Sequence, residues 1–427
     1  MSSVNKERPS TSEHPDGPAT TAQITFAAIW QAGQFLAPLI DHTPLIHSRA
    51  LSAEIDANVY LKFEQMQRGG SFKVRGATYK LSRLTEEQRQ AGVITASAGN
   101  HAQGVAIAAA FYGVPCTIVV PETAPLTKVT ATQSYGAQVI FSGTTYDDAV
   151  QHSAKLQKEL GAIYIPAFDD LDVVTGQGTL GLEMLTALPD ADAIVVPIGG
   201  GGLISGIAIA ARAMKPSIKI IGVEAKGAAS MRASLQAGKI QTLPAIATIA
   251  DGIAIKQPGK ITFPLIQQLV DELILVDDEE IINAILFLME RHKILVEGAG
   301  AAGVAALLQG NLALQKQNIL VPLTGGNLDI HLLGRITEHA LIGANRYLSI
   351  RVRLRDQPGE LAQMLNLIAG MRVNILDVHY QPISNQMPFM QHEAMITLET
   401  RNQAQSLDIL QNLQVAGYVV EEVQALH

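Results

Sequence analysis

The chain has 427 residues, of which 48% are hydrophobic and 16% charged, and its net charge at pH 7 is −8. A chain of this length and composition is expected to form two or three domains with large hydrophobic cores. The negative charge argues against a nucleic-acid partner, and the lack of an apolar run of ~20 residues argues against a membrane-spanning protein.

Residues 1–22 contain many Ser, Thr, Pro and charged residues and lack the apolar segment of a signal peptide. They are expected to form a mobile tail. The single cysteine, Cys116, cannot form an internal disulfide and lies in an apolar segment typical of a core strand. We therefore expect a cytoplasmic protein.

Between residues 24 and 323, apolar strand-like segments alternate with segments of helical spacing. The expected strands are 58–64, 92–97, 116–120, 138–141, 193–197, 219–224 and 318–322. The expected helices are 24–37, 76–84, 101–111, 125–135, 146–160, 176–187, 203–214, 279–292 and 298–309. This alternation predicts an α/β fold whose parallel sheets are covered by helices on both faces.

The pattern changes after residue 346. Residues 348–354 and 373–379 alternate strictly between apolar and polar, which indicates a sheet with one solvated face. A turn at 356–359 leads into a helix. With a further helix at 403–413 and strands at 394–398 and 418–423, the predicted order is β-α-β-β-α-β.

Lys73 is the candidate nucleophile of the chain. It lies beside Phe72 among small and apolar residues, with turn-forming glycines on either side. Most lysines are solvated surface charges. An ammonium group held against apolar surface has a lowered pKa, however, and its neutral amine can attack a carbonyl carbon.

A glycine segment between the strand 193–197 and a helix start is the candidate phosphate-binding loop. It consists of Gly199, Gly200, Gly201 and Gly202, with Leu203 next. Such a loop points backbone N–H groups and a helix N-terminus at a phosphate. A nucleotide P-loop would need a following Gly-Lys-Ser or Gly-Lys-Thr, and the dinucleotide fingerprint would need glycine at Ile204 or Ser205. Pyridoxal phosphate fits instead, since it requires one lysine and one phosphate cradle.

Four motifs in this order resemble those of the pyridoxal-phosphate-dependent L-threonine dehydratases, or threonine ammonia-lyases. They are Ser71-Phe72-Lys73-Val74-Arg75-Gly76-Ala77, Ser97-Ala98-Gly99-Asn100-His101-Ala102-Gln103-Gly104, the four glycines, and Thr324-Gly325-Gly326-Asn327. Each is weak alone, but together they are specific. The resemblance implies a catalytic part at 23–340 with the two-lobed parallel-sheet fold of the tryptophan-synthase-β-like class. A small lobe, about 67–165, would be inserted in the larger one.

The resemblance assigns the cofactor contacts. Lys73 would hold pyridoxal phosphate and later take the α-proton of the substrate, with Phe72 beside the ring. The four glycines and Leu203 would bind the phosphate. Thr324 would face the pyridine nitrogen, where the family commonly has serine. A neutral hydroxyl does not keep that nitrogen protonated as a carboxylate would, which favours β-elimination over transamination.

The resemblance also assigns the substrate contacts. Ser97, Gly99, Asn100 and His101 would form the loop that seats the carboxylate of a small amino-acid substrate. Asn100 would in addition bond the ring hydroxyl of the cofactor, whereas His101 would act mainly through the backbone of its turn.

The implied reaction removes water from L-threonine, and also from L-serine, giving 2-oxobutanoate or pyruvate and ammonia. The nearest alternative is a serine racemase or serine dehydratase on the same scaffold. Racemases of this type carry a serine where this chain has Ala98, which has no exchangeable proton. A non-catalytic amino-acid sensor is an alternative of another class, and Lys73 argues against it.

Two further carboxylates have counterparts in the family that the chain resembles. Glu297 lies near the cofactor ring in relatives. Glu224 belongs to a cation site in some members, but that site also uses a carboxylate six residues on, where this chain has Ser230. No metal site is therefore predicted.

The C-terminal segment Asp356-Gln357-Pro358-Gly359-Glu360-Leu361, followed by Asn374-Ile375, resembles the ACT regulatory domain. The resemblance implies a linker at 341–346 and an ACT-like, ferredoxin-like α+β domain at 347–427. Such domains pair between subunits, so a homodimer or homotetramer is expected. An amino-acid effector, with isoleucine and valine as candidates, would bind near Gly359 and Asn374. A purely structural dimerisation domain is the alternative.

Overall fold

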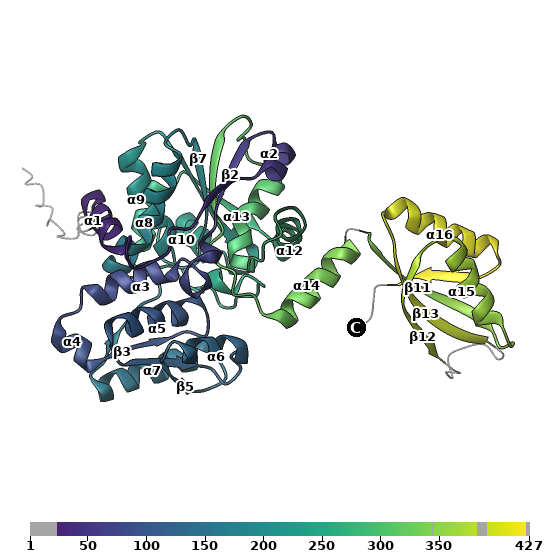
Figure 1. Ribbon diagram of the computed structural model, residues 1–427, viewed down its shortest axis with the longest axis horizontal. Helices are drawn as coiled ribbons and strands as arrows, with labels where there is room; N and C mark the ends of the chain where they lie inside the picture. Colours follow the sequence, from purple (N-terminus) through teal and green to yellow (C-terminus); the bar gives the residue numbers. More distant parts are fainter. Residues whose placement is uncertain (1–23, 344, 382–390, 424–427) are drawn as a thin grey trace, which may run out of the picture. The chain divides into compact units, whose positions relative to one another are not determined.

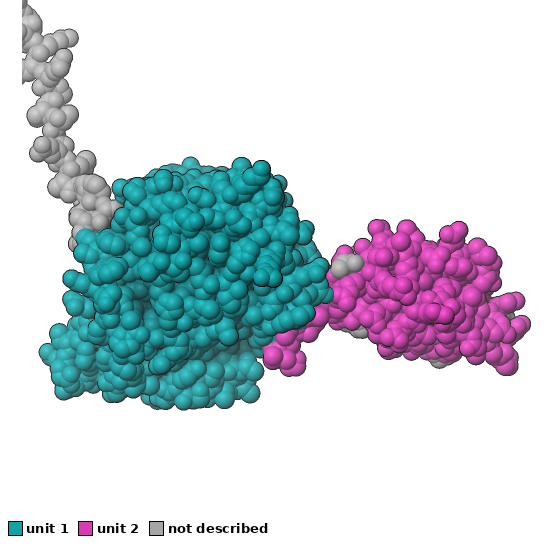
Figure 2. All heavy atoms as spheres, turned by 45° about the horizontal axis from the view of Figure 1, so that its top comes forward, with its two compact units in different colours: residues 1–329 teal, residues 330–427 magenta. Residues whose placement is uncertain are grey.

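We describe the fold from a computed structural model that covers residues 24–343, 345–381 and 391–423. The tail expected over residues 1–22 lies outside these ranges. The chain divides into two compact units, one ending at Asp329 and the other beginning at Ile330 (Figure 2). Helix α14 (Ile330–Gly343) belongs to the second unit. Residues 341–343 of the expected linker are therefore helical, and the division falls before the expected boundary at residue 340.

The larger sheet of the first unit has six strands in the order β1-β2-β10-β7-β8-β9. Neighbouring strands are parallel, as predicted, except that the edge strand β1 is antiparallel to β2. The strands are β1 (Leu45–His47), β2 (Asn58–Lys62), β7 (Ala193–Pro197), β8 (Lys219–Ala225), β9 (Glu272–Val276) and β10 (Asn318–Pro322). The helices that accompany them are α1 (Phe26–Leu36), α2 (Arg49–Ile55), α8 (Leu171–Ala187), α9 (Gly202–Met214), α10 (Ser230–Ala237), α11 (Thr262–Leu269), α12 (Asp278–Phe287) and α13 (Gly298–Leu308).

The smaller sheet of the first unit has four parallel strands in the order β5-β4-β3-β6. The strands are β3 (Val93–Ala96), β4 (Cys116–Val120), β5 (Gln138–Phe141) and β6 (Ile163–Tyr164), and the nearby helices are α3 (Lys73–Ser82), α4 (Glu86–Ala91), α5 (Asn100–Tyr112), α6 (Leu126–Ser134) and α7 (Tyr146–Leu160). In Figure 1 this sheet lies below the larger one, and α3 runs along the boundary between them. The expected two-lobed parallel-sheet fold is thus confirmed.

Short 3₁₀ turns and one π-helical turn complete the first unit. They are η1 (Glu64–Met66), η2 (Arg68–Gly70), η3 (Lys226–Ala228), η4 (Asp251–Ile253) and the π-turn η5 (Leu288–His292). Within the described ranges, no helix is long and apolar enough to cross a membrane.

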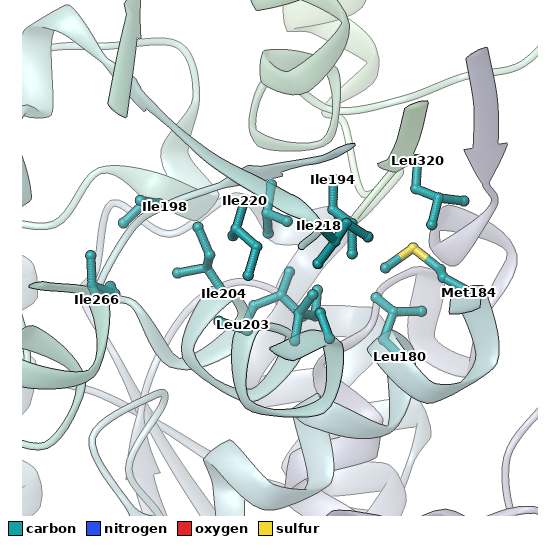
Figure 3. Close-up of a cluster of buried hydrophobic side chains, with 14 of the residues drawn as sticks. Leu180, Met184, Ile194, Ile198, Leu203, Ile204, Ile218, Ile220, Ile266 and Leu320 are labelled. Atoms are coloured by element: carbon teal, nitrogen blue, oxygen red, sulfur yellow. The ribbon is translucent and has the colours of Figure 1, made fainter. Parts of the chain in front are cut away.

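The core beside the larger sheet consists of aliphatic side chains from strands and helices far apart in the sequence. Figure 3 shows Leu180 and Met184 of α8 close to Ile194 of β7 and Leu320 of β10. Every residue of β7 is buried, as its unbroken apolar sequence predicts, because helices cover both faces of a parallel strand. Burying each such side chain stabilises the fold by roughly 1.5–3 kcal/mol.

Helix α3 is held by a buried cluster of charges below its first turn. The Arg75 guanidinium donates to both oxygens of Glu64, at 2.7 and 2.8 Å, and to both oxygens of Glu183, at 2.6 and 3.0 Å. Lys62 donates to the same Glu183 at 2.6 Å. Two cations thus balance two carboxylates in a region where an unpaired charge would be costly. The first turn of α3 therefore has a defined position relative to β2 and α8.

The second unit contains an antiparallel sheet in the order β12-β13-β11-β14. Its elements after α14 are β11 (Tyr347–Arg355), α15 (Glu360–Gly370), β12 (Asn374–Gln381), β13 (Gln391–Glu399), α16 (Gln403–Val415) and β14 (Val419–Glu422). This is the predicted β-α-β-β-α-β order. Ile350 and Ile396 of the sheet pack with Met364 of α15 and Leu413 of α16, which leaves the other face polar. The fold is that of the α+β class expected for an ACT-like domain.

Candidate active site

Lys73 lies at the first residue of α3, with Phe72 as the preceding cap residue. The Phe72 backbone N–H donates to the Thr324 carbonyl at 3.1 Å, and this bond ties the start of α3 to the end of β10. The Lys73 Nζ donates to the Ala167 carbonyl at 2.9 Å and lies 5.2 Å from the centre of the Phe72 ring. The amine thus lies at the junction of the two sheets.

Burial lowers the pKa of the Lys73 amine from 10.5 to about 8, although the nearby Glu297 carboxylate raises it. A substantial fraction of the amine is therefore neutral in mildly alkaline solution. A neutral amine is the form that attacks a carbonyl carbon and accepts a proton. The sequence-based expectation of a desolvated lysine agrees with this geometry.

The four glycines form the turn between β7 and the start of α9. Gly201 is the cap residue, and its φ of +94° favours glycine. A Cβ added at Gly200 would lie 2.3 Å from the Phe168 ring, and one at Gly201 would lie 2.7 Å from the Ile266 side chain. Leu203 is buried in the first turn of α9. A side chain at Gly200, Gly201 or Gly202 would therefore clash with its neighbours.

Phe168 connects the glycine loop with the lysine. Its ring and backbone pack against Gly200 and Gly202, and the carbonyl of the preceding Ala167 accepts the hydrogen bond from Lys73. The amine therefore contacts Ala167, and the glycine loop contacts the next residue, Phe168. The amine and the loop are 126 or more residues apart in the sequence. Sequence reasoning missed Ala167 and Phe168, because neither lies in a recognisable motif.

The loop after β3 forms the uncapped N-terminus of α5. Gly99 is the cap residue, without a side-chain hydrogen bond to the helix, and a Cβ at Gly99 would meet no atom within 4 Å. The Gly99 N–H donates to the Ser97 hydroxyl at 3.3 Å. This open helix N-terminus can bind a carboxylate.

Asn100 joins the small sheet to the large one through its side chain. Its Nδ2 donates to Glu297 Oε1 at 2.5 Å, and its Oδ1 accepts from Asn327 Nδ2 at 2.8 Å. Asn327 also donates to the Gly69 carbonyl at 2.7 Å. Asn327 was not predicted as a site residue, although its place in the Thr324-Gly325-Gly326-Asn327 motif is a signal for it.

His101 is buried, and its Nε2 lies 2.8 Å from the Ile165 carbonyl. A carbonyl oxygen only accepts, so Nε2 carries the hydrogen. Burial, together with the positive charge of Lys73, lowers the pKa of His101 to about 3. The imidazole is therefore neutral at physiological pH and cannot serve as a proton store there.

Thr324 is buried where β10 ends, next to the start of α3. The following Gly325 forms an isolated bridge with Ser71. A Cβ at Gly325 would lie 2.2 Å from Glu297 Oε1, so this position accommodates the Glu297 carboxylate only because it lacks a side chain. The Thr324 motif is thus placed against the lysine motif, as the resemblance implies.

Glu224 lies apart from these contacts. Its carboxylate accepts from the backbone N–H groups of Met231 and Arg232, both at 2.8 Å, and so caps the start of α10. Burial raises its pKa to about 7. Among the described residues, no group of three or more His, Cys, Asp or Glu side chains could hold a metal ion.

Gly359 and Asn374 are not brought together within one chain. Gly359 is the cap of α15, just after β11 ends. Asn374 pairs with Glu399, which pairs with Tyr347 at the beginning of β11. The two predicted effector residues therefore lie at opposite ends of a nine-residue strand, roughly 25–30 Å apart.

Residues 36–325 match the family described as pyridoxal-phosphate dependent enzyme. The chain belongs to this family. The L-threonine ammonia-lyase of Thermotoga maritima is 42% identical over 400 residues, which are 94% of this chain and all of that protein. Among solved structures, the processed form of threonine deaminase isoform 2 from Solanum lycopersicum is 38% identical, has a TM-score of 0.72, and covers 76% of this chain and 94% of its own. Maize serine racemase is 38% identical and has a TM-score of 0.71, and the match covers 76% of this chain and 99% of the racemase chain.

The residues present fit the cofactor of a pyridoxal-phosphate dependent enzyme. One buried amine would hold the aldehyde carbon, and the glycine loop, where a Cβ would clash, would hold the phosphate. Phe72, Asn100 and Thr324 are the candidates for contacts with the ring. When bound, the cofactor supplies an electron sink for the bond that breaks at Cα of an amino acid.

Gly201→Ala tests the glycine loop. The new methyl group would combine a strained positive φ with a clash against Ile266, so we expect affinity for pyridoxal phosphate to fall by about tenfold or more. The measurement is a titration of the cofactor-free protein with pyridoxal phosphate, followed by visible absorbance.

Gly238→Ala is the matched control, because Gly238 also has a positive φ but a Cβ there would meet nothing within 4 Å. It should bind the cofactor like the wild type. Equal affinities for both variants would show that the glycine loop is not the phosphate cradle.

Proposed function

We propose that this protein is an L-threonine ammonia-lyase, which eliminates water from L-threonine, and also from L-serine, to give 2-oxobutanoate or pyruvate and ammonia. The observation that carries the proposal is the desolvated Lys73 amine, joined through Ala167 and Phe168 to the glycine loop. The 42% identity to the Thermotoga maritima L-threonine ammonia-lyase, over its whole length, favours threonine as the substrate.

Lys73 is the base of the proposed reaction. With its pKa lowered to about 8, the amine can take the α-proton of the substrate and release it again near neutral pH. The β-hydroxyl then leaves as water. The released unsaturated amino acid reacts with one water molecule and yields the 2-oxo acid and ammonia.

The other site residues orient the substrate. The open N-terminus of α5, with Ser97 and Gly99, is the proposed seat of the substrate carboxylate. Asn100, fixed by Glu297 and Asn327, is the proposed ligand of the cofactor ring hydroxyl. Thr324, with its neutral hydroxyl, favours prompt elimination over transamination.

The similarity to maize serine racemase makes racemisation the competing reaction. A racemase needs a proton donor on the face of Cα opposite the lysine. In this chain the position just before Gly99 is Ala98, which carries no exchangeable proton. We therefore assign elimination to the site.

The second unit is proposed to be an ACT-like regulatory domain. Its sheet order and its β-α-β-β-α-β connection support this assignment. Since Gly359 and Asn374 lie at opposite ends of β11, one site that uses both would take them from two copies of the chain. A homodimer or homotetramer would supply both residues.

We also propose that the enzyme is cytoplasmic and makes 2-oxobutanoate for isoleucine biosynthesis. Isoleucine or valine would then be suitable effectors.

The catalytic proposal predicts that the purified protein forms 2-oxobutanoate and ammonia from L-threonine. Lys73→Ala should lower this rate by about a thousandfold or more and abolish the visible absorbance of the bound cofactor. Product assays by chromatography and visible spectra would measure the two effects, with Lys219→Ala, at the first residue of β8, as the control. Formation of D-serine from L-serine, without any 2-oxo acid, would replace the assignment with a racemase.

The regulatory proposal predicts that the full-length protein binds isoleucine or valine. Calorimetry should show saturable binding. Asn374→Ala should lower the affinity by about tenfold and leave the basal rate of threonine turnover unchanged. Asn412→Ala, an exposed asparagine on α16, is the control. If no branched-chain amino acid binds, the second unit serves assembly and not regulation.

A further inference from the structure

Two polar contacts join the helices of the small sheet to elements of the large sheet near the site. The first is the hydrogen bond from Asn100 of α5 to Glu297, the cap residue of α13. The second is the ion pair between Lys128 of α6 and Asp251 of η4. Both Lys128 and Asp251 act electrostatically on the Glu297 carboxylate. The two contacts therefore converge on one buried acid.

The position of the Glu297 carboxylate is fixed by its surroundings. Only 2% of the residue is exposed, and its backbone N–H donates to the Gly325 carbonyl at 3.0 Å. The space around Oε1 is closed so tightly that Cβ atoms at Gly325 and Gly252 would lie 2.2 and 3.5 Å from it. The carboxylate therefore has little free space around it.

The charges that face Glu297 come from three elements. Asp251 of η4 is the acidic one, and Lys128 of α6 and Lys73 of α3 are the basic ones; Asp329 also acts on Lys128. Burial and Asp251 raise the pKa of Glu297 to about 7, against the opposing effects of Lys128, the Asn100 hydrogen bond and Lys73. The group thus titrates in the physiological range, as carboxylates in active sites often do.

We propose that Glu297 is a positioning residue of the elimination reaction, whose charge is set jointly by Lys128 and Asp251 and which acts through Asn100. The inference rests on the proposed function. The ionised carboxylate is the stronger acceptor for the Asn100 amide and so holds that side chain more firmly. Protonation of Glu297 weakens this hydrogen bond, so turnover should fall on the acid side of the Glu297 midpoint.

Two substitutions separate this role from a purely structural one. Lys128→Met and Asp251→Asn break the same ion pair, so both remove the same contact between the two sheets. Their electrostatic effects are opposite: loss of the Lys128 charge raises the Glu297 midpoint, and loss of the Asp251 charge lowers it. A shift of roughly half a pH unit or more in each direction is expected.

A second ion pair between the same parts of the unit provides the matched control. Lys256, in the loop before α11, bonds Asp147 of α7 at 2.6 Å, and both side chains are exposed. Neither is among the charges that act on Glu297. Lys256→Met should therefore leave the Glu297 midpoint unchanged.

The experiment follows the protonated carboxyl band of the cofactor-loaded protein by infrared spectroscopy between pH 5 and 9, together with the pH profile of kcat/KM for L-threonine. Glu297→Gln identifies the band by its loss, which separates it from the band of Glu224, whose pKa burial also raises to about 7. We expect a wild-type midpoint near pH 7. We also expect opposite shifts in Lys128→Met and Asp251→Asn, with an acid limb of kcat/KM that follows each.

Shifts of both variants in the same direction, or none, would overturn the joint control by Lys128 and Asp251. An acid limb that stays in place while the infrared midpoint moves, or that persists in Glu297→Gln, would overturn the positioning role. The infrared midpoint needs no turnover. A protein that binds the cofactor but does not act on threonine would therefore refute the proposed function while still reporting on the control of Glu297.

Discussion

One lysine amine has to be kept out of water at the junction of two parallel sheets, and much of the first unit serves that constraint. An ammonium group loses hydration when it is buried, which is why the Lys73 amine is partly neutral near pH 8. The pKa stays low only if the surrounding structure keeps water away from the amine. Arg75, two residues on, anchors the same helical turn through Glu64 and Glu183, and with Lys62 these side chains form a balanced cluster of charges.

The site is assembled from loops that follow strand ends on both sheets. Asn100 comes after β3, the glycine loop after β7 and Thr324 after β10. The carboxyl ends of parallel strands are where α/β proteins bind ligands, because helix N-termini and irregular backbone are exposed there. Placing one such edge from each sheet against the other encloses the amine between them. Glu297 and Asn100 make contact across this boundary, so the charge of one buried acid is tied to the way the two sheets meet.

Much of this could be predicted from the sequence, because the informative signals were local. The unbroken apolar segment at 193–197 is a fully buried strand, and the glycines after it form the turn that their lack of side chains predicts. The helix predicted at 76–84 already begins at Lys73, and the residue before it, Phe72, bonds through its N–H to the distant Thr324. Such long-range bonds leave no periodic trace in the sequence.

The same limit explains what the sequence did not show. Asp251 lies in a short segment without a recognisable pattern, and Lys128 lies in an ordinary predicted helix. The role of both depends on a carboxylate more than 40 residues away from either in the sequence. Helix α14 and strand β9 were also missed. The apolar positions of α14 are interrupted by charged and polar residues, whereas the apolar run of β9 is short. The resemblance assigned Gly359 and Asn374 to one effector site. Only the strand register shows that the two residues lie far apart within a single chain.

The most direct test of the central claim is to reduce the cofactor-loaded protein with borohydride and to locate the modified residue by mass spectrometry of its peptides. The account predicts that a single lysine, Lys73, carries the reduced pyridoxal phosphate group. Modification of any other lysine, or of none, would contradict it.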